Sequence, residues 1–204
     1  MKSDSQPLTA GPPPPQPRPL FQTLARRWPT ALALLLAAGV IASGSGDDPG
    51  DAVSGYADAL PLLPLLYVVV AQLGHPRVTW PVLGAGVVLL FGLGAQDAVP
   101  AGGAMIVVAL GVLLWGMLRG SPHGGTVLGV QVAGAVVFGT LAVAGLVVDA
   151  DLGRYLVAAG WFGHGVWDLA HLRLARLKGV VAPSFAEWCA VVDMAVAVEL
   201  LFLR

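Results

Sequence analysis

Seven apolar segments, each close to the length needed to cross a bilayer, restrict what this sequence can fold into. They lie at about 28–44, 56–74, 78–95, 99–118, 126–148, 152–173 and 184–203. About 20 apolar residues in an α-helix span the hydrocarbon core of a membrane, because the helix rises 1.5 Å per residue. Only 11% of the 204 residues are charged, too few to cover the surface of a soluble protein. The sequence therefore predicts an all-α fold, a polytopic bundle of seven transmembrane helices surrounded by the lipid bilayer.

The charged residues between these segments alternate in sign from loop to loop, and this alternation predicts the topology. One set of loops carries the bases, which are Lys2, Arg18, Arg26, Arg27, His75, Arg77, Arg119, His123, Arg173, Arg176 and Lys178. The other set carries Arg154 and Arg204 but is mainly acidic, with Asp47, Asp48, Asp51, Asp97, Asp149 and Asp151. Basic loops stay on the cytoplasmic side of a membrane. The pattern predicts a cytoplasmic N-terminus and an external C-terminus.

The N-terminal stretch differs from the rest of the chain. Residues 11–19 are rich in proline, which fixes the backbone and removes hydrogen-bond donors, so we expect a disordered cytoplasmic tail over 1–27. The transmembrane helical domain then covers 28–204. The first apolar segment also fits a cleavable signal sequence, in which case six helices remain with unchanged orientations. The length of the proline-rich stretch before it favours an uncleaved helix.

Composition limits the class of protein further. The formal net charge of −1 gives no indication of nucleic-acid binding. Arginine outnumbers lysine, and Ala, Gly and Val dominate, a bias typical of GC-rich bacterial genomes. We therefore expect a multi-pass protein of the bacterial inner (plasma) membrane. Cys189 is the only cysteine, so no disulfide can form within this sequence, and we interpret it as a small buried residue.

Several residues within the segments are expected to serve helix packing. Pro61 and Pro64 should kink the second helix, since each removes a backbone hydrogen bond. Gln72 and Gln131 are amides in apolar surroundings, where hydrogen bonding between helices is their usual role. The many glycines in the segments allow helix backbones to approach closely.

The sixth segment carries a stripe of ionisable residues. At 100° per residue, His164, Asp168 and His171 fall within about 60° of one another on one helix face. An ionisable residue at the centre of a membrane helix costs on the order of 2.5–3.5 kcal/mol on insertion scales. Three of them on one face therefore require a structural or functional reason.

The seventh segment adds Glu187, Asp193 and Glu199. The sixth and seventh helices are antiparallel neighbours, and His164 and Asp193 lie at matching depths, about 13 Å from the loop. A His164–Asp193 pair is therefore allowed, as is a contact of Glu187 with His171 or Asp168. Glu187 and Asp193 point about 120° apart, so one of them is free to face another helix.

Three interpretations of this polar constellation remain open. The first is a divalent metal site, with zinc or iron held by His164, Asp168 and His171, and with Asp193 and Glu187 as further ligands or general base. Such a site would suit an enzyme acting on a lipid or another apolar substrate. The second is a proton path in a small proton-coupled transporter. The third is a hydrogen-bonded network that only fixes helix packing, as in a non-catalytic accessory subunit.

The run Gly160-Trp161-x-x-His164-x-x-Trp167-Asp168-x-x-His171 is followed by Val181-x-Pro183 and an acidic, Cys-containing last helix. Over about residues 158–195 it resembles a family of small bacterial integral membrane proteins of unknown function. The resemblance implies a site on the last two helices and no particular reaction. A looser likeness is to seven-helix intramembrane hydrolases such as the alkaline ceramidases, which hold zinc with His and Asp. No matching acidic motif is found in the second or third segment.

Overall fold

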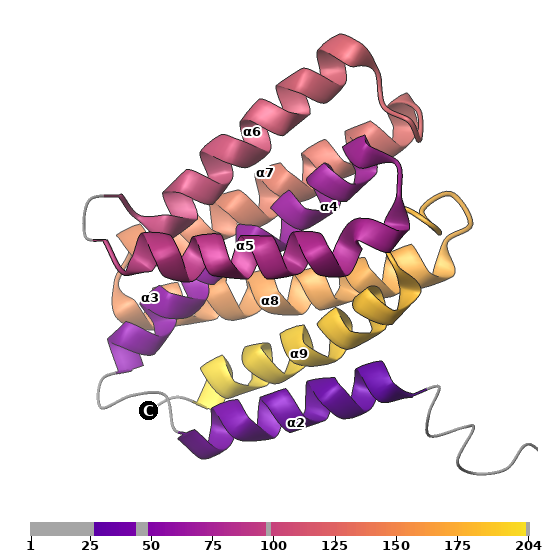
Figure 1. The fold of residues 1–204 in the computed structure, drawn as a ribbon. Helices are drawn as coiled ribbons and strands as arrows, with labels where there is room; N and C mark the ends of the chain where they lie inside the picture. Colours follow the sequence, from indigo (N-terminus) through magenta and orange to yellow (C-terminus); the bar gives the residue numbers. More distant parts are fainter. Residues whose placement is uncertain (1–26, 44–48, 97–98, 203–204) are drawn as a thin grey trace, which may run out of the picture.

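The computed structural model describes residues 27–43, 49–96 and 99–202, and every element in these residues is helical (Figure 1). The elements are α2 (Trp28–Ser43), α3 (Pro49–Ala59), α4 (Leu62–Leu73), the 3-10 turn η1 (Pro76–Val78), α5 (Thr79–Gly94), α6 (Ala101–Arg119), α7 (Gly125–Val147), α8 (Ala150–Arg173) and α9 (Pro183–Phe202). The predicted all-α fold is confirmed. The tail expected over 1–27 lies outside the described residues, apart from Arg27.

The second predicted helix is broken into α3 and α4. It begins at Pro49 rather than at 56, and the helix is interrupted between Ala59 and Leu62, where Pro61 precedes α4. Pro64 causes no second break, because it lies in the first turn of α4, where a missing N–H is tolerated. With α3 and α4 counted as one broken helix, the described residues contain the seven predicted helices. The other helix ends agree with the prediction to within two residues.

Four helical stretches are long and apolar enough to cross a membrane: Gly50–Leu73, Pro76–Gly94, Ala101–Arg119 and Gly125–Val147. α8 and α9 have comparable lengths of 24 and 20 residues, but their sequences include buried ionisable residues. α2 is a shorter apolar helix. The chain is therefore a multi-pass membrane protein. Its two most polar long helices, α8 and α9, place buried ionisable side chains inside the bundle.

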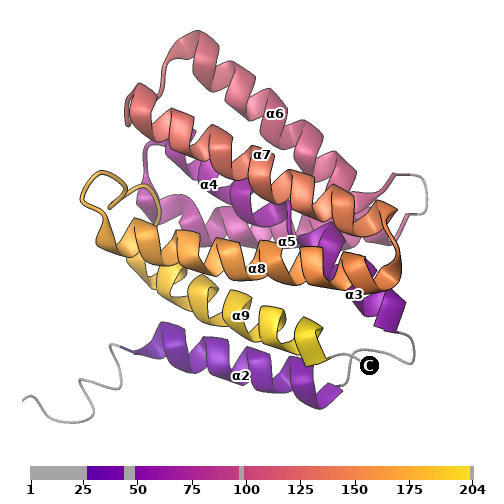
Figure 2. The same ribbon diagram turned by 180° about the vertical axis from the view of Figure 1, so that it is seen from behind.

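α4 lies at the centre of the bundle because it is apolar around nearly its whole circumference, and almost all of its side chains are buried. It contacts α5, α6 and α7, while α8 packs between α7 and α9. α2 is the outermost helix and runs along α9, as both views show (Figures 1 and 2). The interior between α4, α7, α8 and α9 is thus the part of the molecule furthest from lipid.

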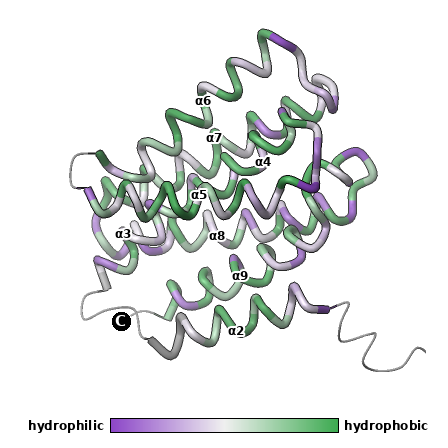
Figure 3. The backbone as a smooth tube through the Cα atoms, in the orientation of Figure 1, coloured by the Kyte–Doolittle hydropathy of each residue, from purple (hydrophilic) through white to green (hydrophobic). Residues whose placement is uncertain are grey.

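Consecutive helices run in alternating directions, so the loops gather at two ends (Figure 1). The start of α2 and the α4–α5, α6–α7 and α8–α9 connections lie at one end, and these segments carry the bases. Asp51, Asp149 and Asp151 lie at the opposite end. The hydrophilic residues of the basic loops are visible at the right of Figure 3. The charge alternation in the sequence therefore corresponds to two ends of one bundle; the cytoplasmic location of the basic end stays a prediction.

Small residues hold α8 against its neighbours. A Cβ atom on Gly153 would meet the backbone oxygen of Gly145 in α7 at 2.4 Å, and one on Gly165 would meet Met194 in α9 at 2.9 Å. Asp149 caps the start of α8 by accepting a hydrogen bond from the Leu152 N–H at 3.0 Å. These contacts fix how far α8 lies from α7 and α9, and α8 carries most of the site described next.

Candidate functional site

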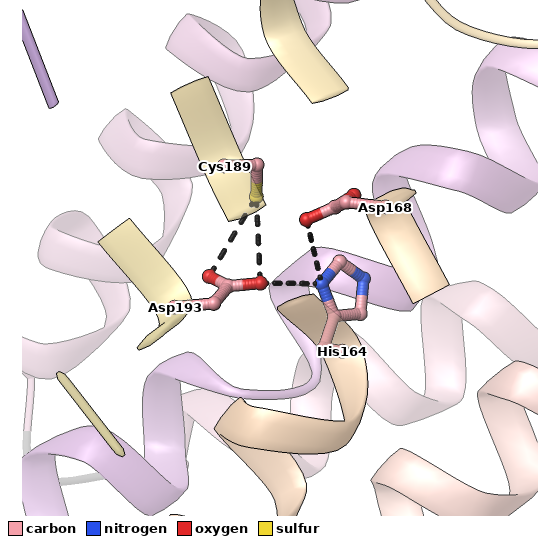
Figure 4. A group of neighbouring side chains, drawn as sticks. All are labelled: His164, Asp168, Cys189 and Asp193. Atoms are coloured by element: carbon pink, nitrogen blue, oxygen red, sulfur yellow. Dashed lines mark hydrogen bonds and ion pairs between the residues drawn. The ribbon is translucent and has the colours of Figure 1, made fainter. Parts of the chain in front are cut away.

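Four metal-ligand side chains meet between α8 and α9 (Figure 4). His164 and Asp168 are one turn apart on α8, and Cys189 and Asp193 are one turn apart on α9. Each pair lies on one helix face because residues at i and i+4 are stacked. One ligand atom from each residue lies within 4.8 Å of the other three. None of the four residues is more than 1% exposed.

The imidazole of His164 is the centre of this cluster. Its Nδ1 lies 2.7 Å from Asp193 Oδ2 and 3.5 Å from Asp168 Oδ2, as the dashed lines in Figure 4 indicate. Cys189 Sγ lies 3.7 and 3.8 Å from the two carboxylate oxygens of Asp193. The predicted His164–Asp193 pair is therefore formed, and Cys189 is buried as predicted. Its position beside both carboxylates makes it a further candidate ligand, which the sequence interpretation did not assign.

The two buried carboxyl groups of the cluster would carry two negative charges if both are ionised. Asp168 and Asp193 are two carboxylates with 0% exposure, and a buried charge is costly unless it is paired. His164 is the basic side chain in contact with both of them. One imidazolium balances one carboxylate, whereas a divalent metal ion balances both. The arrangement can therefore hold either a proton shared with an imidazolium or a metal ion.

Two buried atoms of the cluster have no hydrogen-bond partner among the residues that the structure describes. They are His164 Nε2 and Asp168 Oδ2, the latter having only the 3.5 Å approach to His164 Nδ1. Buried polar atoms in folded proteins are nearly always satisfied, so atoms like these indicate a missing ligand, ion or water. Asp168 Oδ2 faces the space between the four side chains (Figure 4).

Tyr67 supports the cluster from α4. Its hydroxyl donates a hydrogen bond to Asp168 Oδ1, and the residue is 0% exposed. Its ring contacts both histidines, with centroids 5.6 Å from His164 and 4.5 Å from His171. Sequence reasoning missed Tyr67. The available signal was its position as the one hydroxyl side chain in the run Leu62–Val70, the most apolar part of the second segment.

His171 lies beside the cluster rather than among its four ligands. Its Nδ1 donates to the Trp167 carbonyl oxygen at 2.9 Å, and its Nε2 accepts from Gln131 Nε2 on α7 at 3.1 Å. These two hydrogen bonds fit a neutral imidazole that carries its proton on Nδ1. The predicted interhelical role of Gln131 is confirmed. His171 also lines a cavity of about 150 Å³ with Lys178 of the α8–α9 connection.

Glu187 faces away from the cluster. Its carboxylate accepts hydrogen bonds from Thr30 Oγ1 at 2.5 Å and Arg27 Nη1 at 3.1 Å, both contributed by α2 or the residue before it. α9 therefore divides its acidic residues between two neighbours, with Asp193 toward α8 and Glu187 toward α2. The contact of Glu187 with Asp168 or His171, allowed by their depths in the helices, is replaced by this interaction with α2.

Three other residues of the α8 motif hold the helix in place. Gly160 lets Leu60 approach α8, since an added Cβ would meet its Cδ2 at 2.4 Å. Trp161 Nε1 donates to the Tyr56 carbonyl oxygen at 3.1 Å. Trp167 fits against Gly134 of α7. The motif thus combines positioning residues with the ionisable ones.

The fold and the cluster define a class: a multi-pass helical membrane protein with a buried His/Asp/Cys group that could hold a metal ion. The chain matches no protein-family model, and it shows no significant similarity to a curated protein or to a solved structure. Any functional assignment therefore rests on the chemistry of the cluster.

Proposed function

We propose that this chain is a metal-dependent membrane protein that binds one divalent transition-metal ion through His164, Asp168, Cys189 and Asp193. The observation that carries the proposal is the convergence of four metal-ligand side chains, all buried, with their ligand atoms within 4.8 Å of one another. Two of them are carboxyl groups, which a divalent ion would hold in the ionised form by balancing their charge. The unsatisfied Asp168 Oδ2 supports the same conclusion.

The donor set favours zinc. Imidazole nitrogen, carboxylate oxygen and cysteine sulfur are all zinc ligands. Four protein donors suit the tetrahedral geometry of zinc, and zinc can expand to five-coordinate when a substrate binds. A sulfur donor disfavours magnesium and calcium, which take oxygen ligands. Tyr67 would orient Asp168 through its hydrogen bond, as residues behind metal ligands commonly do. This proposal gives His171 and Glu187 no place among the ligands, because both are engaged elsewhere.

We further propose that the ion serves chemistry on a lipid or another apolar substrate. Phe138 of α7 packs against His164, with ring centroids 5.1 Å apart. The next residue, Gly139, lines an apolar groove of about 520 Å³ between α6 and α7, together with Ile106 and Leu110. Phe138 and Gly139 are consecutive residues of α7, so this helix contacts both the cluster and the apolar groove. An apolar substrate held in the groove would reach the ion past α7, with a displacement of Phe138.

A proton-coupled carrier is the second candidate, and the direct His164–Asp193 hydrogen bond of 2.7 Å favours it. In that case a proton shared among His164, Asp168 and Asp193 supplies the positive charge. Tyr67 contacts both Asp168 and His171, which lines the cavity beside the α8–α9 connection. The carrier would move protons along this series of groups.

Elemental analysis of the detergent-purified full chain tests the metal proposal. We expect about one zinc ion, or one other transition-metal ion, per chain. His164→Gln and Asp193→Asn should each abolish that content. Their matched controls are His171→Gln, which also removes an imidazole from α8, and Glu187→Gln, which also removes a carboxylate from α9; both should keep the metal.

Cobalt substitution adds a test of Cys189. Cobalt bound by a thiolate absorbs through sulfur-to-metal charge transfer, and Cys189→Ser should remove this band. Metal-free protein that stays monodisperse and cannot be loaded with zinc or cobalt would overturn the proposal. Proton uptake in proteoliposomes that Asp193→Asn abolishes would then establish the carrier.

A further inference from the structure

A second concave site lies at the basic end of the bundle, away from the metal-ligand cluster. A cleft of about 810 Å³ opens between the start of α7 and the segment after α8. His123, Thr126 and Arg176 supply its polar lining. The volume falls within the range of about 300–1,000 Å³ that small-molecule sites occupy. None of the four residues of the metal-ligand cluster lines this cleft.

The charged residues of the two segments that form the cleft are all basic. The two segments that form it, 119–130 and 173–178, contain Arg119, Arg173, Arg176 and Lys178 together with His123, and they contain no Asp or Glu. An anion held there would meet no opposing carboxylate from these segments. Figure 3 shows the hydrophilic ends of these segments gathered at the same end of the bundle.

Two polar features of the cleft are suited to a phosphate. His123 Nε2 is buried and has no hydrogen-bond partner in the described part of the chain. α7 begins at Gly125 after Gly124, which offers no side chain to cap the helix. The first N–H groups of a helix lack intrahelical partners, and the helix dipole favours negative charge at this position. An oxyanion beside Arg176 at the start of α7 would meet these N–H groups, and His123 would bind it once its imidazole turns toward the cleft.

The remaining lining of the cleft is apolar. Val127 and Val130 continue along α7 toward the middle of the bundle, and Leu174 and Leu177 form the facing side. Leu174 is 55% exposed, so an apolar surface remains uncovered beside the basic one. A free anion would leave this half of the cleft unused, whereas an amphipathic ligand would cover it.

We propose that this cleft binds an anionic phospholipid. Its phosphate lies between His123 and Arg176 at the start of α7, and the upper part of an acyl chain lies along Val127 and Val130. Basic pockets between transmembrane helices bind anionic headgroups in this manner. The proposal is independent of the metal centre, because the two sites share no lining residue.

Native mass spectrometry and thermal unfolding of the full chain in a neutral detergent test the proposal. Phosphatidylglycerol should remain bound and raise the unfolding temperature, while phosphatidylcholine should do neither. Arg176→Gln should weaken phosphatidylglycerol binding about fivefold or more, since one base near an anionic headgroup contributes about that much. Arg176 is exposed, so the substitution should leave the fold intact.

Arg77→Gln is the matched control. Arg77 is also an exposed arginine in one of the basic loops, but it does not line the cleft. Equal weakening by both substitutions would mean general attraction to negative charge and would overturn the proposal. Equal stabilisation by phosphatidylcholine would also overturn it. Full stabilisation by soluble glycerol phosphate, with no added benefit from the lipid, would assign the cleft to a free phosphate compound instead.

Discussion

Replacing Tyr67 by phenylalanine removes one oxygen atom from the middle of the bundle and keeps the aromatic ring. The lost hydroxyl donates to Asp168, and both residues have 0% exposure. A hydrogen bond to a charged group contributes about 1.5–3 kcal/mol, because its loss leaves a buried acceptor unpaired. For a chain of this size, that loss corresponds to a decrease in unfolding temperature of about 3–12 °C. Tryptophan fluorescence during heating in detergent would measure it.

The same substitution should weaken metal binding. Groups that orient a metal ligand typically change affinity by about 10–100-fold, and competition with a chelator would measure the change. Tyr56→Phe is the control, since its hydroxyl donates to Glu199 at 2.7 Å in a partly exposed position. We expect Tyr56→Phe to lower the free energy of unfolding by less than about 1 kcal/mol and to leave the metal affinity unchanged. Wild-type stability and affinity in Tyr67→Phe would refute the assigned role of Tyr67.

Three further perturbations have defined outcomes. Gly153→Ala should destabilise the fold by about 1–3 kcal/mol, because its Cβ would lie 2.4 Å from the Gly145 backbone oxygen; Gly129→Ala, with open space around it, should be neutral or slightly stabilising in the same thermal assay. Removing metal with a chelator should lower the unfolding temperature of the wild-type protein. If the free metal concentration was 100 times the dissociation constant, the lost stability is about 2.7 kcal/mol. The unfolding temperature of Asp193→Asn should not change. In a Cys189→Ser background, a cysteine placed in the 95–100 loop should react with an impermeant maleimide from outside intact cells; protection there combined with labelling of the 119–124 loop would reverse the predicted topology.

The helices and their order are determined by local sequence. Apolar segments of about 20 residues, separated by charged loops, can satisfy their backbone groups in lipid only as helices. The predicted bounds were therefore accurate except at the second helix. The early start of α3 at Pro49 was missed because residues 49–55 are only weakly apolar, and their helix is stabilised by packing against α7 and α8.

The periodicity of the sixth segment placed His164 and Asp168 on one face, and helix depth paired His164 with Asp193. Both inferences use only the rise and turn of an α-helix, which every residue in a helix shares. Sequence could not decide which acidic residue of the last helix faces α8, because that depends on how α9 is rotated against its neighbours. Packing of α2 on the opposite side directs Glu187 outward to Arg27 and Thr30.

Tertiary structure decided which further residues join His164, Asp168 and Asp193. Tyr67 is 101 residues from Asp168 in sequence and meets it because α4 lies at the centre of the bundle. Cys189 joins the cluster, and His171 turns to Gln131, because the glycine contacts of α8 set its distance from α7 and α9. Local sequence thus determined the helices, their polar faces and the order of charged loops. Only the rotation and spacing of packed helices decided which of the ionisable side chains meet, since those depend on side-chain volumes far apart in the chain.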